Sequence, residues 1–236
     1  MNAFEQAFAK LDGGRVLDVA TGQGGFVHAL IELLPSYQEI VGIDSRAQCV
    51  EAAEAAFEQE NVHFVQMDAA EMDFEDGSFD VACISNSLHH MDDLPRVLAE
   101  MQRVIKPGGH LVISEMYRDG QTEPQLTHVQ MHHWWGVIDT ALGVTHRETY
   151  TRQEIVDLVQ GLGLSSLECY DYAELESDPL DPQMVERLEA ATKMYMQRAE
   201  NLPDQQALQQ RGEELIQRLR QVGFQGATHL IVVGQK

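Results

Sequence analysis

The stretch that decides the fold is Val16–Phe26, which reads Val-Leu-Asp-Val-Ala-Thr-Gly-Gln-Gly-Gly-Phe. A β-branched apolar run closes on a glycine-dense turn and leads into a helical pattern over residues 26–34, which predicts a strand, a tight turn and a helix in succession. Gly22, Gly24 and Gly25 would let the backbone adopt positive φ and approach a ligand closely. The amides at the start of the helix would face that ligand. The stretch therefore predicts a nucleotide-type site.

Strands and helices alternate on both sides of this junction. Residues 2–11 suit a short helix, and apolar runs predict four more strands, at Glu39–Asp44, Val62–Asp68, Phe79–Ser85 and His110–Met116. We expect one helix from an N-cap at Ser45 to about residue 59, and another over 94–105 capped by Asp92 or Asp93. Lys106–Gly109 is expected to form a turn. This alternation predicts a parallel sheet covered on both faces, with its ligand outside the carboxyl ends of the strands.

The pattern changes after Met116. Residues 117–150 indicate a partly helical segment rich in His and Trp, without a clear strand. A capping box at Thr151–Glu154 predicts a helix to about residue 162, followed by a sixth strand over about 164–174. Further elements are expected as two helices between about 182 and 222, broken at Asn201–Asp204 with Asp204 as cap, and a last strand at Thr228–Val233.

The composition limits the functions that fit this chain. Its 236 residues can form one domain. The formal charge of −22, from 38 acidic and 16 basic residues, argues against a nucleic-acid partner, since phosphate contacts need basic side chains. Cys49, Cys83 and Cys169 lie far apart, as is typical of reduced cytoplasmic proteins. No signal peptide and no membrane-spanning run are recognisable. We therefore expect a cytoplasmic protein without membrane insertion.

The residues around the glycine turn narrow the choice of ligand. A dinucleotide-binding turn would have its third glycine at position 27, which is Val27 here. Asp18 lies inside the preceding strand, where it would repel a pyrophosphate. Asp44 and Asp68 stand at the ends of the next two strands, and a carboxylate there can accept hydrogen bonds from ribose hydroxyls or a purine amino group. The pattern favours a phosphate-free adenosine site over a nicotinamide dinucleotide site.

With these residues the chain resembles the class I S-adenosylmethionine-dependent methyltransferases that act mainly on small molecules. Five motifs in order carry the resemblance: Val16–Gly25, Val41–Asp44, Gln66–Ala69, Phe79 to His90, and Val104–Val112. The likeness is close over about 14–116 and topological beyond, and the first motif departs from the family in its G-x-G-G order. It implies an α/β, Rossmann-like, seven-stranded, mostly parallel sheet with helices on both faces and an antiparallel last strand. A single domain over 1–236, with helical cap insertions at 117–150 and 180–222, is implied as well.

The resemblance also implies S-adenosylmethionine as the cofactor. Asp18 and two of the glycines would surround its methionine part, Asp44 would hold the ribose hydroxyls and Asp68 the adenine amino group. Ser85 and Asn86 would lie beside the methyl donor. The full set of cofactor-binding residues implied is Asp18, Ala20, Gly22, Gly24, Asp44, Ser45, Asp68, Ala69, Ser85 and Asn86.

Methyl transfer is an in-line displacement at a sulfonium carbon, for which the protein supplies alignment and exclusion of water. An amine or thiolate acceptor needs no base, whereas a hydroxyl or carbon acid does. By position, the candidate catalytic residues are His89 and His90, just after the fourth strand, and Glu115 and Tyr117, at the end of the fifth. The two histidines could equally serve to support the loop.

The segment after Met116 contains a group of imidazoles: His128, His132, His133 and His146. Residues four apart share a helix face, and His is a common zinc ligand. No Cys accompanies them, however, and methyl transfer needs no metal, so we expect no metal site. Trp134 and Trp135 would line an acceptor pocket, where they could form a cage for a cationic amine, or would pack this segment onto the sheet. The apolar stripes of 182–222 would pack against the core or against a partner in a homodimer.

The leading hypothesis is an enzyme that methylates a small molecule. A cofactor-binding regulatory or complex subunit without turnover is the alternative from another class, and a nucleic-acid methyltransferase is a third that the charge disfavours. The sequence leaves the acceptor and its reacting atom open among nitrogen, oxygen, sulfur and carbon.

Overall fold

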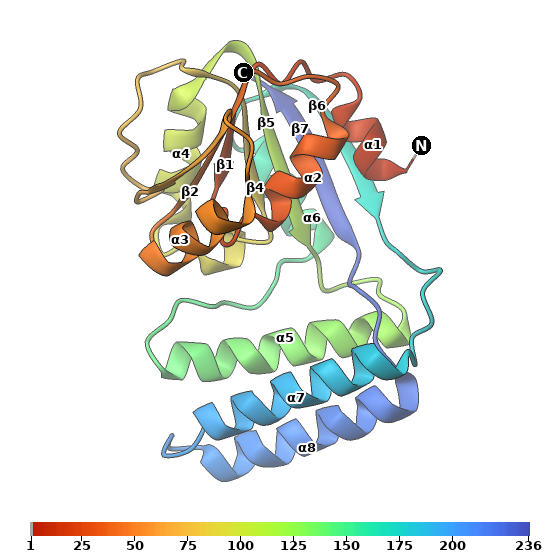
Figure 1. The fold of residues 1–236 in the computed structure, drawn as a ribbon. Coiled ribbons are helices and arrows are strands. Elements are labelled where there is room, and N and C mark those ends of the chain that lie inside the picture. The colour runs from red at the N-terminus through yellow and green to blue at the C-terminus, as the bar shows by residue number, and fades with distance from the viewer. Residues whose placement is uncertain (1) are drawn as a thin grey trace. The chain divides into compact units, whose positions relative to one another are not determined.

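The chain, seen here as a computed structural model that describes residues 2–236, divides into two compact units (Figure 1). The first consists of the residues up to Glu115 with Glu154–Tyr172 and Leu230–Lys236, and the second of Met116–Gln153 and Ala173–His229. The boundary between Glu115 and Met116 lies at the end of the fifth strand. At this point in the sequence the alternation of strands and helices stops and the His- and Trp-rich segment begins.

The first unit is built on a seven-stranded sheet in the order β3-β2-β1-β4-β5-β7-β6. Its strands are β1 (Arg15–Val19), β2 (Glu39–Asp44), β3 (Val62–Gln66), β4 (Phe79–Ser85), β5 (Ile105–Met116), β6 (Ser165–Tyr172) and β7 (His229–Gln235). Leu17 in β1 stands opposite Val41 in β2 and Ala82 in β4, in parallel register, and β7 runs antiparallel. The predicted fold class is confirmed, and the parallel register gathers the carboxyl ends of β1, β2 and β4 at one edge.

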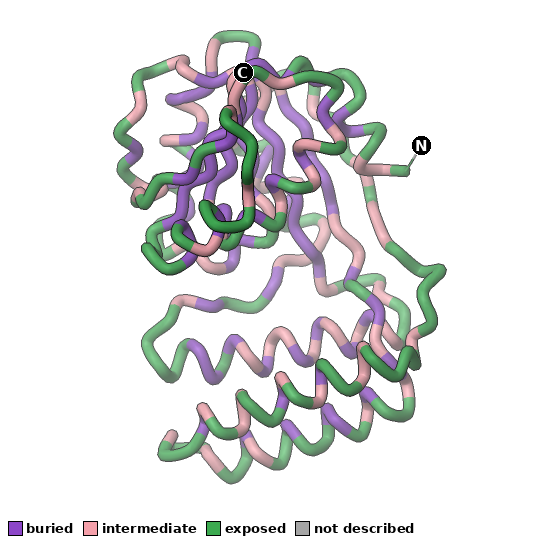
Figure 2. The backbone as a smooth tube through the Cα atoms, viewed as in Figure 1, coloured by how far each residue is buried: buried purple, intermediate pink, exposed green. Residues whose placement is uncertain are grey.

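Six helical elements belong with this sheet: α1 (Ala3–Phe8), α2 (Gly25–Leu33), α3 (Ala47–Ala56), the short 3-10 helix η1 (Leu88–His90), α4 (Leu94–Val104) and α6 (Arg152–Gln160). In Figure 1, α2 and α3 lie in front of the sheet and α4 and α6 behind it. Phe8, Leu30 and Ala53 from three of these helices pack with Val16 and Val81 in one buried cluster. Figure 2 shows the inner strands buried along most of their length, whereas the edge strand β6 is largely exposed.

Two local predictions are wrong. Helix α3 begins at Ala47 with Arg46, not Ser45, at the N-cap, and no side chain caps its amides. Lys106–Gly109 is not a turn between elements, because β5 runs through it, with a register shift against β4 between Phe79 and Val81. The glycines of this segment therefore mark an irregularity inside a strand, where a bulge relieves the pairing.

The second unit contains three helices, α5 (Glu123–Ala141), α7 (Pro182–Arg198) and α8 (Gln205–Val222), which lie side by side in Figure 1. Their shared core is formed by Met131, Trp134, Ile138, Leu188, Ala199, Leu208, Leu215 and Leu219. Trp134 is buried and donates its indole N–H to the Leu208 carbonyl at 3.1 Å. It also lines a cavity of about 520 Å³ within this unit. The predicted pair of helices over 182–222 is confirmed, although Asp204 stands at the N-cap of α8 without a capping side-chain hydrogen bond.

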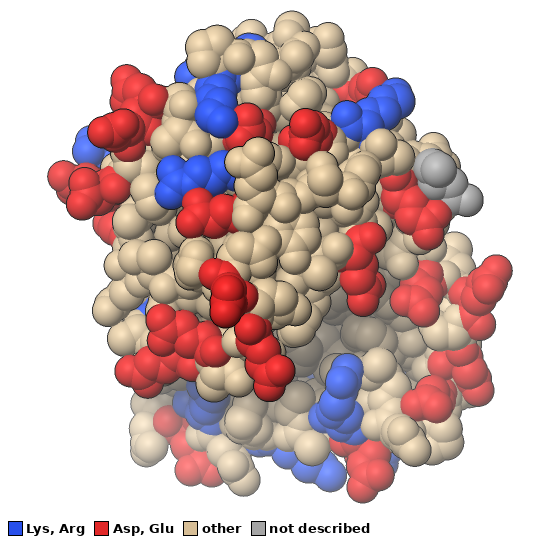
Figure 3. All heavy atoms as spheres, turned by 45° about the horizontal axis from the view of Figure 1, so that its top comes forward, with Lys and Arg blue, Asp and Glu red and all other residues tan. Residues whose placement is uncertain are grey.

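The surface reflects the composition. Acidic side chains outnumber basic ones on the face shown in Figure 3, in line with 38 acidic and 16 basic residues in the chain. Within residues 2–236, no helix combines the length and the apolar character needed to cross a bilayer.

Candidate cofactor and catalytic site

The turn between β1 and α2 has a left-handed backbone conformation at every second residue. Ala20, Gly22 and Gly24 have φ of 55°, 56° and 84°. A Cβ at Gly24 would lie 2.4 Å from a ring carbon of Phe57, whereas one at Gly22 would meet nothing within 4 Å. Packing therefore requires glycine at position 24, while the backbone at position 22 borders open space. Such a turn lets a ligand approach the main chain closely, as the sequence predicts.

Asp18 lies at the carboxyl end of β1 and is 1% exposed. Its Oδ2 has no hydrogen-bond donor among the described residues. Burial raises the pKa of its carboxyl to about 7; the nearby Thr21 hydroxyl lowers it somewhat and the negative charge of Asp44 adds to the rise. A buried carboxylate oxygen without a donor is unfavourable unless a partner arrives. The site therefore fits a ligand that brings a cationic N–H group, such as the ammonium of a methionine moiety.

Asp44 ends β2 and links the glycine turn to the following helix. Its Oδ2 accepts the Gly22 amide at 3.0 Å, and its Oδ1 accepts the Arg46 amide at 2.9 Å and Arg46 Nε at 3.3 Å. A carboxylate offers about four acceptor positions, so three are used within the chain. The remaining position, on Oδ2, fits one ribose hydroxyl. A second hydroxyl would have to displace the exposed Arg46 side chain.

The segment after β3 is held next to the end of β2, because the Met67 amide donates to the Asp44 carbonyl at 3.0 Å. Asp68 is exposed, and its Oδ1 accepts the Ala70 amide at 2.8 Å. The two strand-end carboxylates predicted to face an adenosine group are thus on adjacent strands of the sheet. The neighbouring Ala69 is half-buried, while Ser45 is exposed and its carbonyl accepts from Gln66 Nε2.

The end of β4 is strained. Asn86 has φ of 47°, and its amide donates to the Ser114 carbonyl of β5 at 2.8 Å. The Ser87 hydroxyl donates to the Ser85 carbonyl, which tightens the turn. A positive φ at a residue other than glycine costs free energy and is concentrated at functional sites. Because β4 is next to β1, Ser85 and Asn86 end at the same edge of the sheet as Asp18.

Three of the candidate catalytic residues come together directly after β4. His89 in η1 is 1% exposed, and its Nδ1 lies 3.2 Å from Oε1 of the fully buried Glu115. The other oxygen of Glu115 accepts the Leu88 amide at 2.9 Å, which holds the carboxylate beside the His89 ring. The His90 ring centroid is 4.2 Å from that of His89. Tyr117, the fourth candidate, belongs to the second unit, where its amide donates to the Thr228 carbonyl.

Two residues around this edge were not expected. Thr21 is buried, and its hydroxyl lies close enough to the Asp18 carboxyl to lower the pKa of that group, although it makes no hydrogen bond of good geometry within residues 2–236. Arg46 fixes Asp44 through its amide and side chain. The sequence position of Thr21 inside the glycine turn could have identified it. Likewise, Arg46 stands two residues after the strand-end carboxylate of Asp44, and this position could have identified it.

The chain matches known methyltransferases. A family model described as "Methyltransferase domain" covers residues 10–156, more than half of the chain. Demethylmenaquinone methyltransferases of Staphylococcus aureus and Lactococcus lactis are 40% and 36% identical over 104 and 108 residues, 44% of this chain and 43% of each relative. The chain is thus aligned with less than half the length of these relatives.

Solved structures share the whole fold at low identity. A putative methyltransferase of Bacillus halodurans aligns with a TM-score of 0.62 at 18% identity, covering 99% of this chain and 97% of that one. A Haemonchus contortus phosphoethanolamine N-methyltransferase 2, solved with S-adenosylhomocysteine, aligns at 0.57 and 16%, covering 98% and 52%. At these identities the likeness supports the fold alone.

Proposed function

The chain belongs to the class I S-adenosylmethionine-dependent methyltransferase domains, and on that premise we propose that it transfers a methyl group from this cofactor to a small-molecule acceptor. The observation that carries the proposal is Asp18, a buried carboxylate whose Oδ2 lacks a donor at the end of β1. Beside it, the open backbone at Gly22 leaves room for a ligand. Together they form an edge that is complete only with a cationic, hydrogen-bonding ligand.

Different residues of the chain would bind different parts of the cofactor. Asp18 would accept from the cofactor's ammonium group, Asp44 Oδ2 from a ribose hydroxyl and Asp68 from the adenine amino group. Ser85 and Asn86 would border the reacting carbon. When bound, the cofactor supplies an electrophilic methyl group on a sulfonium. The protein's part is to align the acceptor in line with the breaking carbon–sulfur bond and to exclude water.

For an acceptor that must lose a proton, we propose His89 as the base. With Nδ1 protonated beside Glu115, Nε2 would take the proton while the acceptor–carbon bond forms and the carbon–sulfur bond breaks. Glu115 would act as a positioning residue that fixes the imidazole tautomer. His90 and Tyr117 are the further candidates by position.

The acceptor is proposed as a small molecule and not a nucleic acid, because the chain has 38 acidic but only 16 basic residues, and phosphate contacts need basic groups. The acceptor of the demethylmenaquinone methyltransferases is not carried over to this chain. The aligned parts are less than half of each protein, and acceptor specificity can reside in the unaligned remainder.

Calorimetry with S-adenosylhomocysteine is the first test. We expect the wild type to bind, Asp18→Asn to bind at least about tenfold more weakly because a charge-assisted hydrogen bond is lost, and the exposed control Asp73→Asn to bind as the wild type does. A methyl-release assay against pooled metabolites then tests turnover. Absence of binding would refute the proposal. Binding without turnover on any pool would favour the regulatory-subunit alternative.

A second comparison separates His89 from a loop-supporting residue. If His89 is the base, His89→Gln lowers kcat at least about a hundredfold and leaves the affinity for S-adenosylhomocysteine unchanged. Glu115→Gln should also lower kcat without changing the affinity for S-adenosylhomocysteine, since the carboxylate lies 3.2 Å from His89 Nδ1 and would position the imidazole. A loss of cofactor affinity equal to the loss of kcat would indicate a structural role instead.

A further inference from the structure

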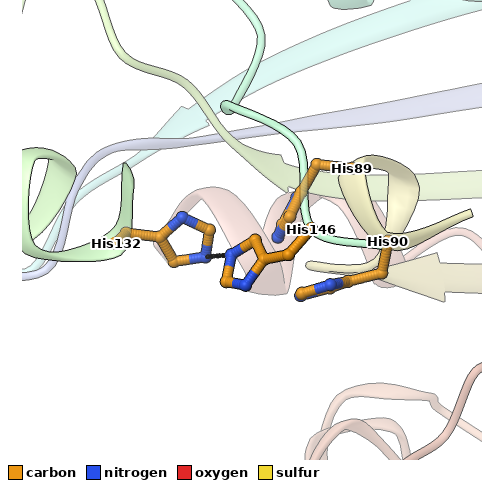
Figure 4. A group of neighbouring side chains, drawn as sticks. All are labelled: His89, His90, His132 and His146. Carbon is orange, nitrogen blue, oxygen red and sulfur yellow. Dashed lines mark hydrogen bonds between the residues drawn. The ribbon is translucent and has the colours of Figure 1, made fainter. Parts of the chain in front are cut away.

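Two histidines of the second unit face each other through the same ring atom. His132, on α5, and His146, in the segment that follows, bring their Nε2 atoms to 3.3 Å (Figure 4). His146 is buried and His132 half-buried. Neither residue is needed for the methyl transfer proposed above, so the pair calls for an explanation of its own.

The other two histidines of this segment have structural contacts. His133 Nε2 accepts the Thr149 amide at 3.2 Å and lies 2.9 Å from the Thr149 hydroxyl. His128 Nδ1 accepts the Ala227 amide at 2.9 Å. These imidazoles tie separate segments of the unit together. Of these four histidines, only His132 and His146 bring their ring nitrogens together.

The orientation of His146 is fixed by a carboxylate behind it. Its Nδ1 donates to Asp139 Oδ2 at 2.8 Å. Asp139 is itself held by the Tyr195 hydroxyl at 3.1 Å and by an ion pair with Arg198 at 2.6 Å. With the proton on Nδ1, the lone pair of neutral His146 is on Nε2 and points at His132. A carboxylate that orients a ligating imidazole in this way is the usual outer-sphere partner of a metal-bound histidine.

The spacing of the two nitrogens suits a metal as well. Zinc–nitrogen bonds of about 2.0–2.1 Å in tetrahedral geometry place two imidazole nitrogens about 3.3 Å apart, which is the distance observed. We propose that His132 and His146 are two ligands of a divalent transition-metal ion of the zinc type. Asp139 orients one of them, and other nitrogen or oxygen donors complete the coordination. The competing explanation is a hydrogen bond between the rings, donated by His132.

The two explanations differ in a measurement that does not involve methyl transfer. Full-length protein without an affinity tag, stripped with a chelator, is titrated with Co²⁺ and followed by visible absorption, then competed with Zn²⁺. We expect one ion per chain, a loss of at least about a hundredfold in affinity for His132→Gln and for His146→Gln, and a loss of 10–100-fold for Asp139→Asn. The exposed His63→Gln serves as the matched control and should bind like the wild type.

A measurement on the wild type guards against variants that fail to fold. In nitrogen-detected histidine spectra, Zn²⁺ should shift the Nε2 signals of His132 and His146 and leave that of His63 in place. Absence of a cobalt band together with absence of any zinc-induced shift would establish the hydrogen-bonded pair and overturn the proposal. So would shifts confined to other histidines, or affinities that stay within twofold in both histidine variants.

Discussion

Replacing Asp18 by asparagine should make the ligand-free protein relatively more stable as the pH rises. Burial raises the pKa of this carboxyl from 3.8 to about 7, so between these values the folded state keeps a proton that the unfolded state has released. The unfolded state therefore binds fewer protons, and the free energy of unfolding falls as pH increases through this window. Above pH 7 the Asp18 carboxyl is ionised in both the folded and the unfolded state, and the stability that its protonated form contributed is lost.

The size of the effect follows from the pKa. A rise of about three pH units at about 1.4 kcal/mol per unit corresponds to about 4 kcal/mol at pH 8, and about 2 kcal/mol of this is already lost at pH 5. Asparagine does not titrate. Asp18→Asn should therefore gain about 2 kcal/mol over the wild type between pH 5 and pH 8, whatever constant cost the buried amide adds. Groups that do not interact with Asp18 titrate alike in both proteins, so their contributions cancel.

Urea unfolding followed by far-UV circular dichroism at the two pH values measures this difference. Asp73→Asn, an exposed control, should show no change relative to the wild type. If the stability of Asp18→Asn relative to the wild type changes by less than about 0.5 kcal/mol between pH 5 and pH 8, the carboxyl is not desolvated and the reasoning fails.

Two further substitutions test the packing of each unit. Gly24→Ala should lower the free energy of unfolding by more than about 1 kcal/mol, because its Cβ would lie 2.4 Å from the Phe57 ring. Gly22→Ala, where a Cβ would have open space at φ of 56°, should lower the free energy of unfolding by less. Equal losses of unfolding free energy for the two variants in urea would contradict this. Trp134→Ala should cost about 3–5 kcal/mol, whereas Trp134→Phe should lose mainly the hydrogen bond to Leu208, about 1 kcal/mol. An alanine variant within about 1 kcal/mol of the wild type would contradict the burial of this indole.

Most of the sheet could be predicted because its signals are local. The run Glu39–Asp44 is apolar, short and bounded by helical patterns, and it forms a strand with those bounds. The start of α3 could not be predicted from Ser45, because Asp44 takes the Arg46 amide through a contact that propensity does not encode. Similarly, Lys106–Gly109 looks like a turn in isolation. These residues have no partner in β4; instead the Gly108 amide donates to the Lys236 carbonyl and the Lys236 amide to the Gly109 carbonyl, both at 2.9 Å, and the local sequence does not show this pairing.

The positions of the proposed cofactor-binding residues were easier to predict than the histidine pair for the same physical reason. Asp18 and Asp44 stand at the ends of parallel strands, whose placement follows from topology. No topological rule of this kind brings His132, Asp139 and His146 together. His132 and Asp139 lie on α5, but His146 lies beyond the end of this helix, so helical periodicity cannot predict its position. Their hydrogen bonds depend on the path of the segment after α5, which is fixed by tertiary contacts.

The unfavourable features of the first unit are gathered where the ligand is proposed to bind. Of the three non-glycine residues with positive φ among the described residues of this unit, Ala20 and Asn86 stand at the carboxyl ends of β1 and β4, near the buried carboxyl of Asp18, and only Ser166 lies elsewhere, in β6. Such costs persist only where the surrounding fold overcomes them. A cationic ligand would favour the ionised form of Asp18 and lower its pKa. The decline in stability between pH 4 and pH 7 should therefore disappear in saturating S-adenosylhomocysteine, and its persistence in the bound protein would place the ligand's charge elsewhere.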